Sequence, residues 1–155
     1  MPPEISNRIS ATVVAVFRAN GRMLEWGDAF AAPFGLTSAR WQILGAIALS
    51  PQTITTPRIA EQMGVSRQGA QKQLNLLLDD GLIEKLPNPG HRRSPHYRLT
   101  PSGTALFQQI DTAWAAHAQL AGQHFSAAEL ETTLRVLGAL TDLHAMPSQG
   151  EQDEA

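Results

Sequence analysis

Several polar side chains recur on one side of a short helical segment, where they could hydrogen-bond to the edges of nucleic-acid bases. The outward set is Arg67, Gln68, Gln71, Lys72 and Asn75, beginning just after Ser66. Amide side chains pair bidentately with adenine, whereas Arg and Lys bind guanine, and all of them reach phosphates. The opposite side carries an apolar stripe with helical spacing. The pattern indicates a helix that reads the major groove of DNA. An ordinary solvated helix face is the alternative.

A second group of basic residues follows in a loop that cannot be helical. Pro87, Pro89, Gly90 and Pro95 break a helix and favour a hairpin loop. Its tip carries His91, Arg92 and Arg93. Exposed arginines on a protruding loop can enter a narrow minor groove, where the negative potential is enhanced. We therefore expect Arg92 and Arg93 to contact DNA; a merely solubilising loop is the alternative.

The segments around these residues predict a helix, a tight turn, a second helix and a hairpin. Thr56 and Pro57 suit the start of the first helix. Gly64 fits its left-handed end, Val65 is expected to be buried in the turn, and Ser66 caps the second helix. The runs LIEKL and HYRLT then predict two strands, and the β-branched run QTITT (residues 52–56) a further short one. This order describes a helix-turn-helix with a basic wing.

Long helical patterns flank this segment. Residues 5–32 and the stretch after Pro101 carry apolar stripes, and Ser126 with Glu129 forms a capping-box pattern before a last helix. The predicted fold class is mainly α with a small β-hairpin wing. We assign residues 37–100 to a winged helix-turn-helix, residues 1–36 and 101–146 to helical dimerisation, and residues 147–155 to an acidic disordered tail. Packing of the flanking helices within one monomer is the alternative.

The charge of the chain is unevenly distributed. The net charge is −2, but residues 58–100 hold seven basic and four acidic residues, whereas residues 101–155 hold one basic and seven acidic. Positive charge is thus concentrated in the segment expected to meet phosphates. The chain has no cysteine, which excludes disulfides and thiolate metal sites. Without a signal-peptide pattern or a long apolar run, a cytoplasmic protein without membrane association is expected.

These motifs, taken in order, resemble the MarR family of bacterial transcriptional regulators over nearly the whole chain. The resemblance rests on a long first helix, LTSARWQIL, IAEQMGVSRQGAQKQLNLLLDDGLIEKL, an RR wing and LTPSG. It implies a homodimeric winged helix, palindromic operators, and often release by a small aromatic or phenolic ligand. It maps the base-reading helix onto Ser66 to Asp79 and the wing-tip arginine onto Arg92 or Arg93.

The wing departs from the family pattern D-P-x-D-R-R, because Asn88 and His91 stand where the family has acids that help to hold the wing. This departure puts the rigidity of the wing in question. His91 could also add a pH-dependent charge at the DNA edge, with a solvated loop histidine as the alternative.

Aromatic residues near the expected junction of dimer and DNA-binding regions suggest an effector pocket. The candidates are Trp26, Phe30, Trp41, Trp114 and His117. Aromatic walls with a few polar groups suit a planar organic ligand, although plain core packing explains them equally well. His117 and His124 lack a dense set of further metal ligands, so we expect no metal and no cofactor. No phosphate loop, GxSxG or HExxH pattern indicates an enzyme. A winged-helix protein-interaction module without DNA binding is the competing function.

Overall fold

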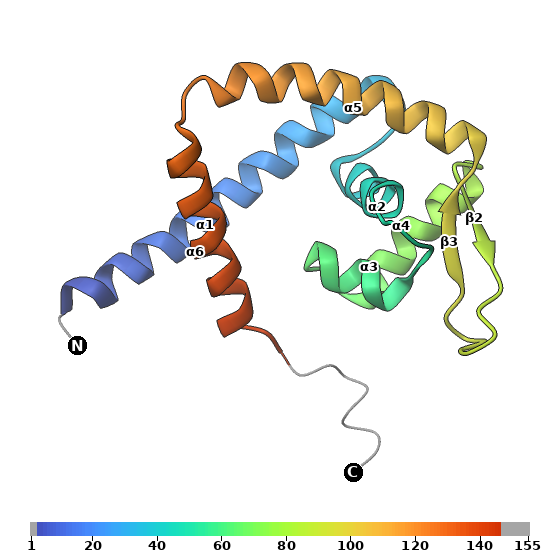
Figure 1. Ribbon diagram of the computed structural model, residues 1–155, viewed down its shortest axis with the longest axis horizontal. Helices are drawn as coiled ribbons and strands as arrows, with labels where there is room; N and C mark the ends of the chain where they lie inside the picture. Colours follow the sequence, from blue (N-terminus) through green and yellow to red (C-terminus); the bar gives the residue numbers. More distant parts are fainter. Residues whose placement is uncertain (1–2, 147–155) are drawn as a thin grey trace, which may run out of the picture. The chain divides into compact units, whose positions relative to one another are not determined.

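The chain forms a mainly helical fold with one small antiparallel sheet, which the computed structural model describes for residues 3–146 (Figure 1). The elements are α1 (Pro3–Ala31), η1 (Ala32–Phe34), α2 (Ser38–Ala48), β1 (Ile54–Thr55), α3 (Thr56–Met63), α4 (Arg67–Asp79), β2 (Ile83–Leu86), β3 (His96–Leu99), α5 (Pro101–Gly122) and α6 (Ala127–Leu143). This order confirms the predicted helix-turn-helix followed by a hairpin wing. The acidic tail predicted for residues 147–155 lies outside the described residues.

The sheet has the order β1-β3-β2, with both pairings antiparallel. In the register, Tyr97 of the central strand β3 lies opposite Ile54 of β1 and Lys85 of β2. The short strand expected in residues 52–56 is therefore confirmed. It pairs with β3 and adds a third strand to the hairpin. The sheet lies beside the α2–α3–α4 group (Figure 1).

The core is formed by the sheet and these three helices, together with Ala31 of α1 and Ile110 of α5. Its largest fully buried side chains are Tyr97, Leu44, Ile59, Leu74, Leu77 and Ile110. Leu74 and Leu77 lie three residues apart on α4, and Ala70, one turn earlier, is also fully buried. This helical spacing confirms the predicted inward stripe, so the opposite side of α4 faces solvent.

Two details at the helix-turn-helix differ from the predictions. The N-cap of α3 is Thr55 rather than Thr56, and its side chain makes no capping bond. Thr56 is the first residue of the helix and is buried, and its hydroxyl donates to Gln71. Val65 is 45% exposed and not buried. The turn closes through its backbone, since Gly64 adopts φ 65° and the Val65 N–H donates to the Ala60 carbonyl.

By their internal contacts the described residues fall into two compact units, with the boundary inside α5 between Thr112 and Ala113. The first unit contains the winged helix and α1. The second contains the remainder of α5 and α6, which begins with the predicted capping box: Ser126 Oγ accepts from Glu129 N at 3.1 Å, and Glu129 accepts from Ser126 N at 2.9 Å. The assignment of the flanking helices to dimerisation stays a prediction.

Candidate nucleic-acid interface

The start of α4 is fixed by its own cap. Ser66 Oγ accepts a hydrogen bond from Gly69 N at 2.9 Å, which satisfies one of the free N–H groups of the first turn. A Cβ atom on Gly69 would lie 3.0 Å from that oxygen, so a glycine suits the position. The Ser66 side chain, predicted to contact DNA, therefore also holds the helix start.

The exposed side of α4 forms an open groove in which polar side chains lie beside the apolar Leu76. It is lined by Ser66, Gln68, Gly69, Gln71, Lys72, Asn75 and Leu76. Five of the predicted DNA-contacting residues thus share one surface. The side chains of Gln68 and Lys72 make no hydrogen bond or ion pair with any residue in the described part of the chain, so their polar ends are available to a ligand.

Gln71 is placed differently from its neighbours on this surface. Its Oε1 accepts from the Thr56 hydroxyl at 2.9 Å, and its Nε2 donates to Asn75 Oδ1 at 3.0 Å and to the Tyr97 hydroxyl at 3.3 Å. The amide therefore already has partners within the protein, on α3, α4 and β3. The sequence does not predict this role, because Thr56 suits the start of a helix and Tyr97 lies in a predicted strand far along the chain.

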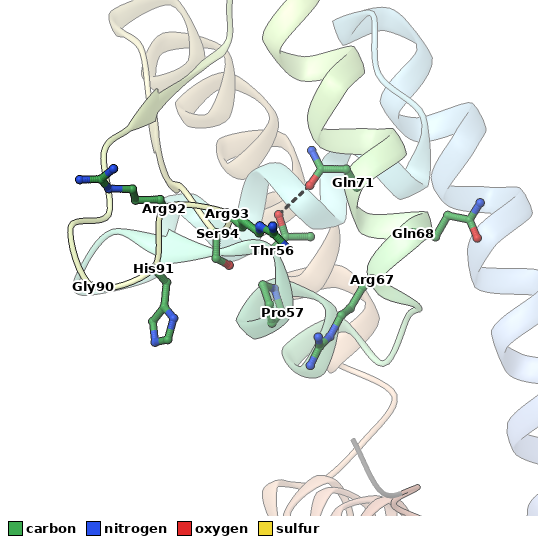
Figure 2. Close-up of a pocket in the computed structure, with 10 residues that line it drawn as sticks. All are labelled: Thr56, Pro57, Arg67, Gln68, Gln71, Gly90, His91, Arg92, Arg93 and Ser94. Atoms are coloured by element: carbon green, nitrogen blue, oxygen red, sulfur yellow. Dashed lines mark hydrogen bonds between the residues drawn. The ribbon is translucent and has the colours of Figure 1, made fainter. Parts of the chain in front are cut away.

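A second groove, of about 740 Å³, lies between the start of α4 and the wing (Figure 2). Its lining is Thr56, Pro57, Arg67, Gln68, Gln71, Gly90, His91, Arg92, Arg93 and Ser94. We call it the basic groove, because three arginines and a histidine line it and no carboxylate does. Figure 2 shows Arg93 pointing toward Thr56, whereas Arg92 points away on the other side of the loop. The groove thus brings the arginine of α4 and those of the wing to one surface.

The wing is held together by Asn88. Its Nδ2 donates across the loop to the Ser94 carbonyl at 2.9 Å, and its own carbonyl accepts from His91 N at 3.0 Å. Ser94 N in turn donates to the His91 carbonyl at 3.0 Å. The amide thus provides a cross-loop bond in a wing that lacks the family's acids.

Among the described residues, the cations of this surface lack acidic partners, whereas other arginines of the winged helix form ion pairs. Arg40 pairs with Asp80 at 3.2 Å, Arg58 with Glu61 at 3.7 Å, and Arg98 with Glu84 on the neighbouring strand. Within residues 3–146, by contrast, no carboxylate pairs with the cations Arg67, Lys72, Arg92 and Arg93. An unpaired, solvated cation can bind a phosphate without first breaking an internal salt bridge.

The aromatic candidates for an effector pocket fall in both units. In the first, Trp26 stacks on Phe30 with ring centroids 4.8 Å apart, and Phe30 lies 5.1 Å from Trp41. In the second, the rings of Trp114 and His117 lie 5.6 Å apart. Trp26 and Phe30 are in direct contact, so a planar ligand could not lie between those two rings unless they separated. The pocket stays a prediction.

Neither a grouped metal-ligand set nor a membrane span is found in the part of the chain that the structure describes. Among residues 3–146, His, Asp and Glu side chains form no group of three or more that could hold a metal ion. Across the same residues, no helix combines the length and the apolar character needed to cross a bilayer.

Comparisons with known proteins place these features among regulators. The family model described as MarR family matches residues 34–94, which include α2, the helix-turn-helix and most of the wing. An uncharacterized protein of Mycobacterium tuberculosis (strain ATCC 25618 / H37Rv) is 40% identical over 106 residues, covering 68% of this chain and 73% of that protein. The multiple antibiotic resistance protein MarR of Salmonella typhimurium (strain LT2) is 30% identical over the same length, with the same coverage of both.

Solved structures show the same architecture. A crystal structure of a MarR family transcription regulator is 28% identical, covers 90% of this chain and 92% of its own, and gives a TM-score of 0.73. A mutant MarR from E. coli, complexed with operator DNA, is 23% identical with coverage of 86% and 96% and a TM-score of 0.70. The likeness extends beyond the winged helix into the flanking helices, since each covers more than four fifths of the chain.

Proposed function

The chain belongs to the MarR family of transcription regulators, and from this premise we propose that it binds operator DNA as a homodimer and represses transcription until a small ligand releases it. In this proposal α4 enters the major groove, with Arg67, Gln68, Lys72 and Asn75 at the bases and nearby phosphates. Arg92 and Arg93 of the wing contact the adjacent backbone or minor groove.

The observation that carries the DNA-binding proposal is the charge arrangement of the interface. Three arginines line the basic groove with no carboxylate among its residues, although the chain as a whole has a net charge of −2. Arginines elsewhere in the winged helix are neutralised by acidic partners. Phosphate binding is governed by such local charge rather than by the total.

The homodimer proposal is supported by apolar side chains that the described residues leave exposed. On α1, Ile5, Ile9 and Val16 follow helical spacing and are 48%, 49% and 37% exposed. On α6, Leu130, Leu134 and Leu137 do the same at 44%, 70% and 38%. Contiguous apolar stripes of this kind mark interaction surfaces. A symmetric pair of subunits would present two α4 helices about one turn of DNA apart, roughly 34 Å, and would favour an inverted repeat.

Ligand release is proposed from the aromatic residues near the end of α1 and the start of α2. Their rings offer apolar walls, and a ligand that binds there could change the separation of the two α4 helices. Such a ligand shifts DNA binding only if it prefers one arrangement over the other.

An electrophoretic mobility shift with duplexes selected from a random pool tests the core of the proposal. We expect the wild-type protein to retain a duplex at low salt and to select a sequence with dyad symmetry. The triple variant Arg67→Ala, Arg92→Ala, Arg93→Ala should fail to retain it while keeping its thermal stability. A folded wild-type protein that retains no duplex at low salt would instead favour the winged-helix module that binds another protein.

A further inference from the structure

We propose that Gln71 is a positioning residue that fixes the wing sheet to the recognition helix α4, rather than a residue that reads a base. This inference rests on the proposed function, because it concerns how the same surface binds DNA. It reassigns a residue whose type and place on α4 predict adenine recognition.

The amide of Gln71 uses most of its hydrogen-bonding capacity inside the protein. Both Nε2 hydrogens are donated, to Asn75 Oδ1 at 3.0 Å and to the Tyr97 hydroxyl at 3.3 Å. Oε1 accepts from the Thr56 hydroxyl at 2.9 Å. A primary amide has two donors and one two-lone-pair acceptor, so one acceptor position remains.

Recognition of adenine would disrupt this arrangement. A bidentate contact needs Oε1 and Nε2 together, in the plane of the base. Turning the amide outward would leave the hydroxyls of Thr56 and Tyr97 without this partner, and these residues are only 8% and 1% exposed. Unpaired buried polar groups are unfavourable. Gln68, one turn earlier, is exposed and has no such internal bonds, so it is the glutamine suited to reading a base.

The partners of Gln71 show what the network holds in place. Tyr97 lies in the central strand β3, paired with both β1 and β2, and the β2–β3 hairpin carries the wing. Thr56 is the first residue of α3 and directly follows β1. One side chain of α4 therefore bonds to the sheet at the base of the wing and to the start of the preceding helix. This connection keeps Arg67 of α4 and Arg93 of the wing at a fixed separation across the basic groove.

The experiment compares Gln71→Met, Tyr97→Phe and the control Gln68→Met. Met is close to Gln in length but offers no amide, and Tyr97→Phe removes only a hydroxyl that is buried away from DNA. Affinities are measured for the selected duplex and for every single base-pair variant of it. We expect both variants to weaken all duplexes alike. Tyr97→Phe loses one internal hydrogen bond and should weaken binding by about two- to tenfold. Gln71→Met loses three and should weaken binding at least as much. Gln68→Met should instead relax preference at one base pair.

A double-mutant cycle that combines Gln71→Met with Arg93→Ala tests whether Gln71 acts on DNA binding through the wing. A role of Gln71 confined to α4 would give additive losses of affinity. If Gln71 positions the wing, the affinity losses from Gln71→Met and Arg93→Ala should be less than additive, because a displaced wing already binds the DNA less well. Relaxed preference at a single base pair in Gln71→Met, with additive losses and a silent Tyr97→Phe, would overturn the inference while leaving the proposed function intact.

Hydrogen exchange of the free protein tests the network without DNA. Backbone amides of residues 86–97 should exchange faster in Gln71→Met and Tyr97→Phe than in the wild type or Gln68→Met. Equal exchange in all four proteins would overturn the inference. If the wild type retained no duplex, the proposed function would fail, and this comparison would still decide whether Gln71 fixes the wing.

Discussion

Gly103 of α5 packs against the carbonyl oxygen of Leu82 so closely that a Cβ atom at residue 103 would lie 1.9 Å from that oxygen. The close approach is part of a joint between the hairpin and α5. Thr100 donates its hydroxyl to the Gly81 carbonyl at 2.6 Å and accepts from Gly103 N at 3.1 Å, while Thr100 N donates to the Leu82 carbonyl. The sequence LTPSG thus needs its glycine for this close approach, not for a positive φ.

Gly103→Ala should therefore destabilise the protein by about 2–4 kcal/mol, because the clash is with backbone and cannot be relieved by a rotamer change. Urea unfolding measures the loss. Gly21→Ala in α1 is the matched control, since a Cβ there meets nothing within 4 Å. It should be neutral or stabilising by up to about 1 kcal/mol. Equal stability of the two variants would contradict the proposed joint.

Removing the cross-loop bond of Asn88 should loosen the wing. We expect Asn88→Ala to accelerate tryptic cleavage after Arg92 and Arg93 and to weaken DNA binding by about two- to tenfold, because the loop loses one internal hydrogen bond. Limited proteolysis followed by mass spectrometry identifies the cleavage sites. Ser94→Ala is the control, since the acceptor is the backbone carbonyl of that residue and survives the change. Unchanged cleavage in Asn88→Ala would show that this bond does not order the loop.

Arginines of the basic groove should determine the salt dependence of DNA binding. Removing one phosphate-binding cation should reduce the slope of log K against log salt concentration by about 0.9. Arg93→Ala should therefore flatten the slope by about one per half-site and weaken binding to all sequences. Titrations at several salt concentrations provide the slopes. Arg135→Ala in α6, which lines neither groove, should leave the slope unchanged; a comparable effect of both variants would argue against the assigned surface.

A single charge on the α6 stripe should oppose dimerisation. Leu134 is 70% exposed in the chain by itself, and Leu134→Glu would place a carboxylate at the proposed interface, where desolvation is unfavourable. Sedimentation at micromolar concentration should show a wild-type species of twice 16.8 kDa and a shift toward 16.8 kDa in the variant. Thr132→Glu adds the same charge two residues away and should keep the dimer. A wild-type monomer would contradict the proposed assembly.

A phenolic or aromatic-acid ligand should raise the melting temperature and weaken DNA binding together. A coupling of roughly 1–3 kcal/mol suffices for a usable switch. Thermal shifts and operator release are followed across a compound panel, first with the wild type and then with Trp41→Ala. Ligands that stabilise the protein but never change DNA affinity would show that the site does not regulate. A panel without any binder at millimolar concentration would identify these aromatics as core residues.

Periodicity and turn chemistry were sufficient to predict the order of elements, because each signal is local. The leucine stripe of α4, the left-handed Gly64 and the capping box at Ser126 each depend on residues within a few positions. The same signals misplaced the start of α3 by one residue and predicted a buried Val65. In both places the outcome depended on contacts from outside the local segment or on backbone bonds that side-chain pattern does not encode.

The residues of the candidate interface could be predicted from the sequence, but the hydrogen bonds among them could not. Helical spacing assigns Gln68 and Gln71 to one exposed side, and nothing local distinguishes them. Their difference arises from Thr56 and Tyr97, which lie 15 and 26 residues from Gln71. The substitution of an acid by Asn88 likewise indicated a weaker wing, whereas the amide forms a bond across the loop that a carboxylate could not donate.

Gln71 is bonded inside the protein and the Gln68 side chain, within the described residues, is not, and this difference affects how such a regulator can diverge after gene duplication. In the proposed interface, the side chains of Gln68 and Lys72 make no internal bond within the described residues, so replacing them should change what α4 recognises without destabilising the fold. Ser66 and Gln71 bond to the helix start, to Thr56 and to Tyr97, so changes there should disturb the architecture itself. New operator preferences can therefore arise by few mutations, at a small set of sites, from a scaffold that stays stable while it explores them.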